Sequence, residues 1–218
     1  MEVNNYYIFI LTYFSTFFLS VICILYLKSS FKQEKAFKIF TAYLFVILTI
    51  QVCLIFDLVG RYNLHLSHFY FISRFLLLSL FYHTLFKKVK HKNMVKSVNI
   101  IVISLLTIQY IMDSAAFGSQ MNTLEIVLTN LGIVAFSVMY FYNSLLKPSV
   151  FMYINSGILL YLLSSTLIFC VGNILVLGSK EFRSGPMLVN SVFYIVYLGF
   201  IYIEWFKSCK KTTTNRLS

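Results

Sequence analysis

The chain has 218 residues, of which 59% are hydrophobic, 18% aromatic and 11% charged, with a formal net charge of +11. Soluble globular domains carry about 25% charged residues. The composition therefore excludes a soluble domain, a disordered chain and a nucleic-acid-binding domain. Together with a mean hydropathy of +0.81, it predicts an all-α polytopic membrane protein.

Seven apolar segments are long enough to cross a bilayer as helices, because a span needs about 20 residues. In chain order, the predicted spans are 6–27, 39–60, 69–86, 97–117, 124–146, 151–177 and 187–206. We therefore predict a seven-helix transmembrane bundle over residues 1–206, followed by a basic tail over residues 207–218. Small residues in the sixth span, among them Gly157, predict close packing against another helix.

The basic residues predict the orientation of the bundle. Most of the 18 Lys and Arg residues fall in the connectors after the first, third and fifth spans or in the tail. The positive-inside rule then places the N-terminus outside and the C-terminus in the cytoplasm of a cell inner (plasma) membrane. The same basic face is expected to attract anionic lipids, so the net charge requires no direct nucleic-acid partner.

Polar side chains at membrane depth are the candidate functional residues, because they are costly and rare there. We predict an outward-facing ligand-binding pocket formed by Asp57, Arg74, Asp113, Glu125, Asn130, Asn173 and Asn190. Arg74 is its deep cation, and the three carboxylates are the candidate counter-ions. His83 and Glu204 form a predicted inner polar group.

A purely structural role for Arg74 is a real alternative. One charge at mid-bilayer costs about 2.5–3.5 kcal/mol on insertion scales. An ion pair at about 4 Å returns roughly 4 kcal/mol at an effective dielectric constant of 20. The sequence thus leaves open a structural Arg–Asp pair, a ligand or ion site, and a side chain that extends to the interface. Three carboxylates for one arginine favour a site beyond a single Arg–Asp ion pair, in which a carboxylate is protonated or water or a cation is present.

The sequence motifs give no support to metal or enzyme chemistry. His65 and His68, three residues apart, offer only a partial set of zinc ligands together with Asp57 or Glu125. The cysteines have no paired spacing. HExxH and P-loop motifs are lacking, and no lysine lies within a span to form a retinal Schiff base. We expect no metal and no cofactor, and we assign no catalytic residue. Enzymatic activity stays open without support from the motifs, with a lipid-modifying enzyme as a third functional alternative.

A faint internal repeat and the overall composition carry two resemblances. Asp57 and Arg74 are 17 residues apart, as are Asn173 and Asn190, and each pair straddles an outer connector. The three-one-three arrangement resembles the seven-helix sugar transporters of the SWEET type, whose helix-breaking prolines and PQ-type motifs are missing here. The Ile, Phe, Tyr, Lys and Asn bias resembles small seven-helix bacterial membrane proteins. These include membrane portions of sensor kinases and membrane accessory proteins encoded beside CRISPR nucleases.

Two functions follow as expectations. The first is an integral membrane sensor or accessory protein that binds a small polar ligand or a partner helix in the outer pocket and acts through a cytoplasmic or membrane protein partner. The alternative is a small-solute or ion transporter or pore, which includes assembly as a homo-oligomer. Transport requires the outer polar group to connect with the inner one, whereas a sensor requires only the outer pocket.

Overall fold

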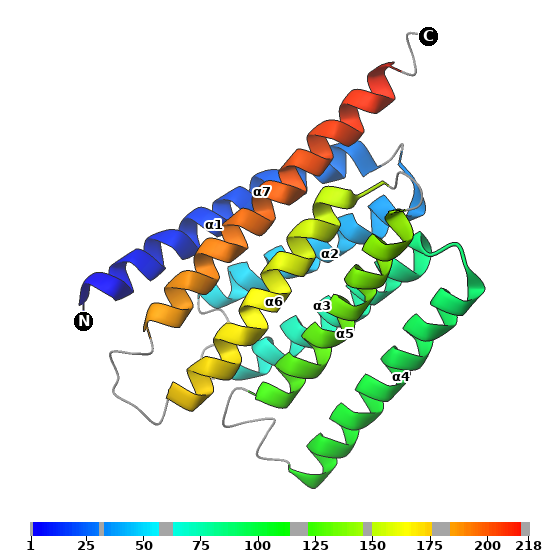
Figure 1. Ribbon diagram of the computed structural model, residues 1–218. Coiled ribbons are helices and arrows are strands. Elements are labelled where there is room, and N and C mark those ends of the chain that lie inside the picture. The colour runs from blue at the N-terminus through cyan, green and yellow to red at the C-terminus, as the bar shows by residue number, and fades with distance from the viewer. Residues whose placement is uncertain are drawn as a thin grey trace. The chain divides into compact units, whose positions relative to one another are not determined.

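The computed structural model is all-helical and describes residues 2–30, 33–56, 63–113, 122–145, 150–175 and 184–214. In this part of the chain there are seven helices, as predicted (Figure 1). They are α1 (Glu2–Ser30), α2 (Lys35–Ile55), α3 (Asn63–Leu85), α4 (Val89–Met112), α5 (Thr123–Ser144), α6 (Met152–Leu175) and α7 (Ser184–Thr214).

Six of these helices are long and apolar enough to cross a membrane. They are α1, α2, α4, α5, α6 and α7, and the chain therefore has the helices of a multi-pass membrane protein. Helix α3 is not among them, because its described part carries Arg74 and three histidines in a sequence that is otherwise apolar. The seventh span and the orientation remain predictions.

The bounds of the observed helices differ from those of the predicted spans, and two of the differences concern charged residues. The predicted fourth span, 97–117, passes the end of α4, since α4 ends at Met112 and Asp113 follows with a non-helical backbone (φ −132°, ψ 85°). The N–H of Asp113 still bonds the carbonyl of Gln109 (2.8 Å), which closes the helix at its C-terminus. At the other end of the chain, α7 continues to Thr214, so the basic segment after residue 207 begins as helix.

The chain divides into two compact units. Unit 1 contains Met1–Gln33 and Ser137–Ser218, and unit 2 contains Glu34–Phe136. Within unit 1, α7 packs against both α1 and α6 (Figure 1). Within unit 2, α3 packs against both α2 and α4. Helix α5 begins in unit 2 and ends in unit 1.

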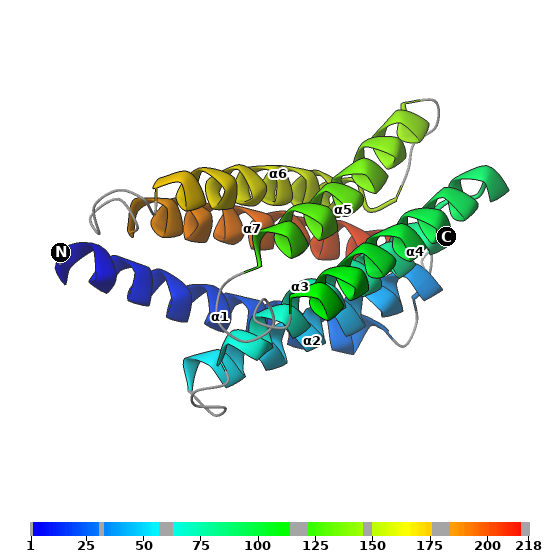
Figure 2. The ribbon, with the colours of Figure 1, turned by 90° about the horizontal axis from the view of Figure 1, so that it is seen from below.

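Close packing of α6 against α7 forms one part of unit 1, and the two helices lie side by side in Figure 2. A Cβ atom added to Gly157 would lie 2.9 Å from the Cβ of Phe200, so only glycine fits this approach. The predicted close packing at Gly157 is thus confirmed. One turn further along α6, the Tyr161 ring stacks on Tyr197 with 5.3 Å between centroids.

Helices α1 and α7 run in the same direction (Figure 1) and are joined by hydrogen bonds that side chains of both helices donate. The hydroxyl of Tyr26 donates to the carbonyl of Ile201 (3.0 Å). The indole N–H of Trp205 donates to Ser29 Oγ (2.9 Å). The Tyr26 bond is buried, so it gives a polar group a partner inside the bundle.

The apolar part of unit 2 is rich in aromatic side chains. On α3, the buried positions recur every three or four residues, as expected for one face of a helix; they include Phe71, Phe75, Leu78, Phe81 and Tyr82. The ring of Phe81 packs against Phe40 of α2, with 5.2 Å between centroids. The same α3 face carries His68 and Arg74 closer to its N-terminus, where the core becomes polar.

Candidate functional site

A buried polar network lies in unit 2, where α3 and α5 begin and α4 ends. Asn122 precedes α5 as its N-cap, because its side-chain oxygen accepts the backbone N–H of Glu125 (3.2 Å). The Asn122 and Gln109 amides also bond each other reciprocally, at 3.0 Å in both directions. The cap therefore fixes the first turn of α5 against the last turns of α4.

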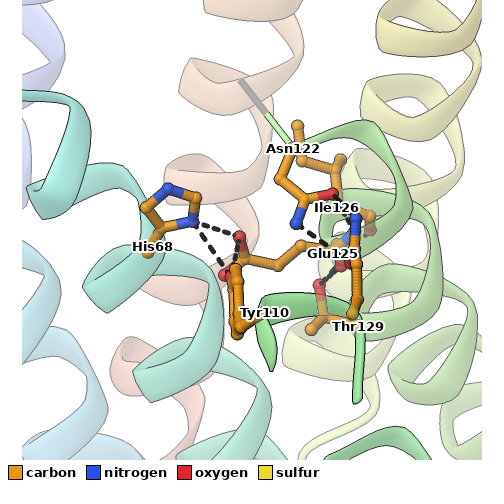
Figure 3. A network of polar contacts seen from close by, with 7 residues as sticks. His68, Tyr110, Asn122, Glu125, Ile126 and Thr129 are labelled. Carbon is orange, nitrogen blue, oxygen red and sulfur yellow. Dashed lines mark hydrogen bonds and ion pairs between the residues drawn. The ribbon is translucent and has the colours of Figure 1, made fainter. Parts of the chain in front are cut away.

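Three ionisable side chains converge at this cap. Figure 3 shows His68 of α3, Tyr110 of α4 and Glu125 of α5 pointing toward one another. Glu125 Oε2 lies 2.5 Å from His68 Nδ1 and accepts a hydrogen bond from the Tyr110 hydroxyl (2.9 Å). The Tyr110 hydroxyl also lies 3.1 Å from His68 Nδ1. One carboxylate oxygen thus links three helices.

The position of Glu125 is costly and only partly compensated. The side chains of His68 and Glu125 are 2% and 1% exposed, respectively. The second carboxylate oxygen, Glu125 Oε1, is buried and has no hydrogen-bond partner among the described residues. A buried acceptor without a donor costs about 1–3 kcal/mol. This oxygen therefore offers a place for a hydrogen-bond donor or a cation.

Arg74 forms the second part of the network and is 1% exposed. Its guanidinium donates a hydrogen bond to the side-chain oxygen of Asn130 on α5, which is fully buried. It also lies over the rings of Tyr70 and Phe71, 4.9 and 5.0 Å from their centroids. These contacts compensate the buried guanidinium with an amide oxygen and two aromatic faces.

The structure brings some of the predicted pocket residues together. Arg74, Asn130 and Glu125 share the unit 2 network. Asp113, expected inside a span, is instead an exposed residue after the end of α4, because the helix stops before it.

The other predicted pocket residues lie elsewhere or are not described. Asp57 lies outside the described residues, as does the side chain of Asn173 on α6. Asn190 belongs to α7 in unit 1, where its side-chain oxygen is buried with no hydrogen-bond partner among the described residues.

The two predicted inner residues lie in different units. His83 is on α3 in unit 2, and its Nε2 atom is buried without a hydrogen-bond partner in the described part of the chain. Glu204 is on α7 in unit 1, where its carboxylate accepts the backbone N–H of Tyr153 at the start of α6 (2.9 Å). Glu204 therefore has a structural role, because it caps a helix N-terminus.

Sequence reasoning missed Tyr110 and Asn122 and considered His68 only as a metal ligand. The available signal was an Asn three residues before Glu125, which is typical of a helix N-terminus. That pattern predicts an ordered first turn of α5 but not which helix its carboxylate faces. Among the described residues, no three His, Cys, Asp or Glu side chains come together as metal ligands.

The fold and the network together define a helical membrane protein with a buried, titratable polar site. Comparison with known proteins found no matching family model, curated protein or solved structure.

The chemical consequence of this arrangement follows from its contacts. One carboxylate oxygen of Glu125 joins α3 and α4 to the first turn of α5, so a change in the charge of Glu125 changes the forces between these three helices.

Proposed function

We propose that the protein is a multi-pass inner-membrane sensor or accessory protein whose responsive element is the unit 2 network. The observation that carries this proposal is the buried carboxylate of Glu125, with one oxygen bonded to His68 and Tyr110 and the other without a partner among the described residues. With the N-terminus outside, the network lies toward the outer surface. A small polar ligand or a proton enters there, and a cytoplasmic or membrane protein partner receives the response.

The composition of α3 supports sensing over transport. Between Arg74 and His83 the buried side chains of this helix are almost all apolar: Phe75, Leu78, Phe81 and Tyr82, with Ser79 as the small polar exception. A solute or proton path along α3 would need polar groups in this layer, since an apolar layer cannot hydrate an ion. The alternative function, a transporter or pore, finds its support in the buried Arg74 and the titratable groups around it.

The first experiment measures proton and solute flux in proteoliposomes that hold the wild-type chain, Arg74→Leu or Arg74→Lys. The sensor proposal expects wild-type flux equal to that of empty liposomes. The sensor proposal would be overturned in favour of a transporter if the wild type showed flux, Arg74→Leu removed it and Arg74→Lys kept part of it. Arg74→Lys keeps the positive charge but not the planar guanidinium, so it separates the effect of the charge from the effect of the side-chain shape.

A second experiment tests the response itself. Trp205 is the single tryptophan of the chain and bonds α1 near its end, so its fluorescence reports on the C-terminal part of α7. We expect its emission to shift between about pH 8 and pH 5, the range where histidines and buried carboxyls titrate. Glu125→Gln should abolish the shift, whereas the matched change Glu34→Gln at an exposed carboxylate should preserve it. An equal shift in wild type and Glu125→Gln would contradict the proposal.

A further inference from the structure

The interface between α6 and α7 in unit 1 has a register that its contacts define. Gly157 of α6 lies against Phe200 and Tyr197 of α7, where an added Cβ atom would meet both side chains at 2.9 Å. Four residues further along α6, the Tyr161 ring contacts the rings of Tyr197 and Tyr194, with 5.3 and 5.4 Å between centroids. Residue numbers therefore fall along α7 as they rise along α6, so the two helices are antiparallel here.

The next turn of this interface changes from aromatic to polar. Ser165 lies one helical turn beyond Tyr161 on α6. Asn190 lies one helical turn before Tyr194 on α7. Because residues four apart share a face of a helix, both side chains continue the face that packs against the other helix. The antiparallel register therefore brings Ser165 and Asn190 to the same level of the interface, next to the packed tyrosines.

Ser165 Oγ and Asn190 Oδ1 are buried, and neither atom has a hydrogen-bond partner among the described residues. The Ser165 side chain is 1% exposed. Ser156 and Thr166 on the same helix each donate to the backbone carbonyl four residues earlier, at 2.9 and 2.7 Å. Such a bond is a common way to satisfy a hydroxyl in an apolar helix, and Ser165 does not make it. The Ser165 hydroxyl and the Asn190 side-chain oxygen are thus available to a ligand.

We infer that Ser165 and Asn190 bind a small neutral molecule with a hydroxyl group between α6 and α7. Asn190 Oδ1 only accepts, so it needs a donor, whereas the Ser165 hydroxyl donates or accepts. One hydroxyl group serves both residues, because its oxygen accepts from Ser165 while its hydrogen donates to Asn190. A cation would be a costly ligand at membrane depth, because α6 contains no acidic residue and α7 contains none before Glu204.

Two sources carry this chemistry: water and a small alcohol. The ligand is small because the adjacent turn is filled by the packed rings of Tyr161, Tyr194 and Tyr197, which are 6%, 7% and 2% exposed. Buried waters typically bond polar groups that have no other partner. The inference goes beyond the proposed sensing function and does not depend on it, since both residues belong to unit 1 and the polar network belongs to unit 2.

The direct test detects water at the site by NMR, on the isotope-labelled full chain in lipid nanodiscs. Magnetisation is transferred from water to amide protons of the protein. We expect cross-peaks at the Asn190 side-chain amide and the Ser165 backbone amide, and none at Gly157, which is closely packed against α7. Absence of the water cross-peak from either site residue would overturn the inference. A cross-peak of equal strength at Gly157 would show water along the whole interface and would also overturn it.

Unfolding in SDS distinguishes a bound molecule from an unsatisfied hydroxyl. If the Ser165 hydroxyl bonds a ligand, Ser165→Ala loses that bond and should raise the equilibrium constant of unfolding about fivefold. If it bonds nothing, the same change removes a buried polar group without a partner and lowers the constant, which would overturn the site. Ser156→Ala is the matched control on α6, because its hydroxyl bonds the backbone. It should leave the water cross-peaks at Ser165 and Asn190 unchanged.

A double-mutant cycle tests whether one molecule bonds both residues. Asn190→Leu should lose most of the same contribution, so Ser165→Ala/Asn190→Leu should unfold little more readily than Asn190→Leu alone. Ser156→Ala should instead add its full effect to that of Asn190→Leu. Additive losses at Ser165 and Asn190 would overturn the shared ligand. The NMR measurement on the wild type decides the question if the double variant does not fold.

Methanol, titrated into the same nanodisc sample, distinguishes the two sources. If it shifts the Asn190 side-chain amide signal to saturation and weakens the water cross-peak, the site takes the hydroxyl of a small alcohol as well as water. If the water cross-peak keeps its strength, water itself is the ligand. These results stand apart from the flux and fluorescence experiments, which test unit 2.

Discussion

Two buried glutamates, one in each unit, are compensated in different ways. Glu204 of unit 1 is 6% exposed, and its carboxylate accepts a backbone N–H at the start of α6. Glu125 of unit 2 is 1% exposed and bonds the side chains of His68 and Tyr110. The first contact caps one helix of unit 1, whereas the second joins side chains of three helices in unit 2.

The comparison teaches where to look for function in an apolar bundle. A buried charge by itself indicates only that something compensates it. Helix capping accounts for Glu204 completely. Capping does not account for Glu125. The N-cap of α5 is Asn122, whose side-chain oxygen accepts the backbone N–H of Glu125, and the Glu125 side chain bonds residues of two other helices. The partner-less carboxylate oxygen of Glu125 in the described residues is why the proposed responsive element lies in unit 2.

The largest expected effect comes from removal of Glu125. Glu125→Ala removes the common acceptor of the buried His68 and the half-buried Tyr110, so we expect a loss of about 3–5 kcal/mol in the free energy of unfolding. Unfolding in mixtures of SDS and mild detergent, followed by circular dichroism, measures it. The double variant His68→Leu/Glu125→Leu should recover most of the loss, because apolar residues need no partner. Additive losses in the two leucine single variants would contradict the pairing.

The sequence predicted the helices better than the site because helix formation depends on local composition. Runs of apolar residues placed all seven helices, and Asp113 was expected inside a span because Ala115, Ala116 and Phe117 continue the apolar pattern of the sequence beyond it. Arg74, Glu125 and Asn130 were predicted site residues because polar groups stand out in such runs. Tyr110 was missed because one more tyrosine among 16 carries no signal until its neighbours are known.

A glycine variant tests whether close packing of α6 against α7 stabilises unit 1. In Gly157→Ala the new methyl would lie 2.9 Å from Phe200 Cβ and from Tyr197 Cδ2, so α6 and α7 must separate. Overpacking of this kind costs about 1–3 kcal/mol. Gly199→Ala on α7 is the control, because its methyl meets no atom within 4 Å. Its melting temperature should be equal to or above that of the wild type. Equal destabilisation by both changes would remove the packing explanation.

A smaller effect is expected from the helix cap of Glu204. Glu204→Ala removes the acceptor of the Tyr153 N–H and a negative charge from the start of α6, for a loss of about 1 kcal/mol. Glu204→Gln keeps an acceptor oxygen and should lose less than half of that. Neither variant should alter the pH response of Trp205 fluorescence, whereas Glu125→Gln abolishes it. A pH response that depends equally on both glutamates would end the distinction between the two units.

The smallest effect concerns a contact that is neutral at every pH. Tyr26→Phe deletes the hydroxyl that bonds the carbonyl of Ile201 and keeps the ring in place. Interhelical hydrogen bonds in membrane proteins average about 0.6 kcal/mol, since the unfolded helices in the membrane find other partners. We expect a loss of this size, the same at pH 5 and pH 8, in the SDS unfolding measurement. A loss that differed between the two values of pH would mean that the Tyr26–Ile201 hydrogen bond itself depends on a titrating group, contrary to this expectation.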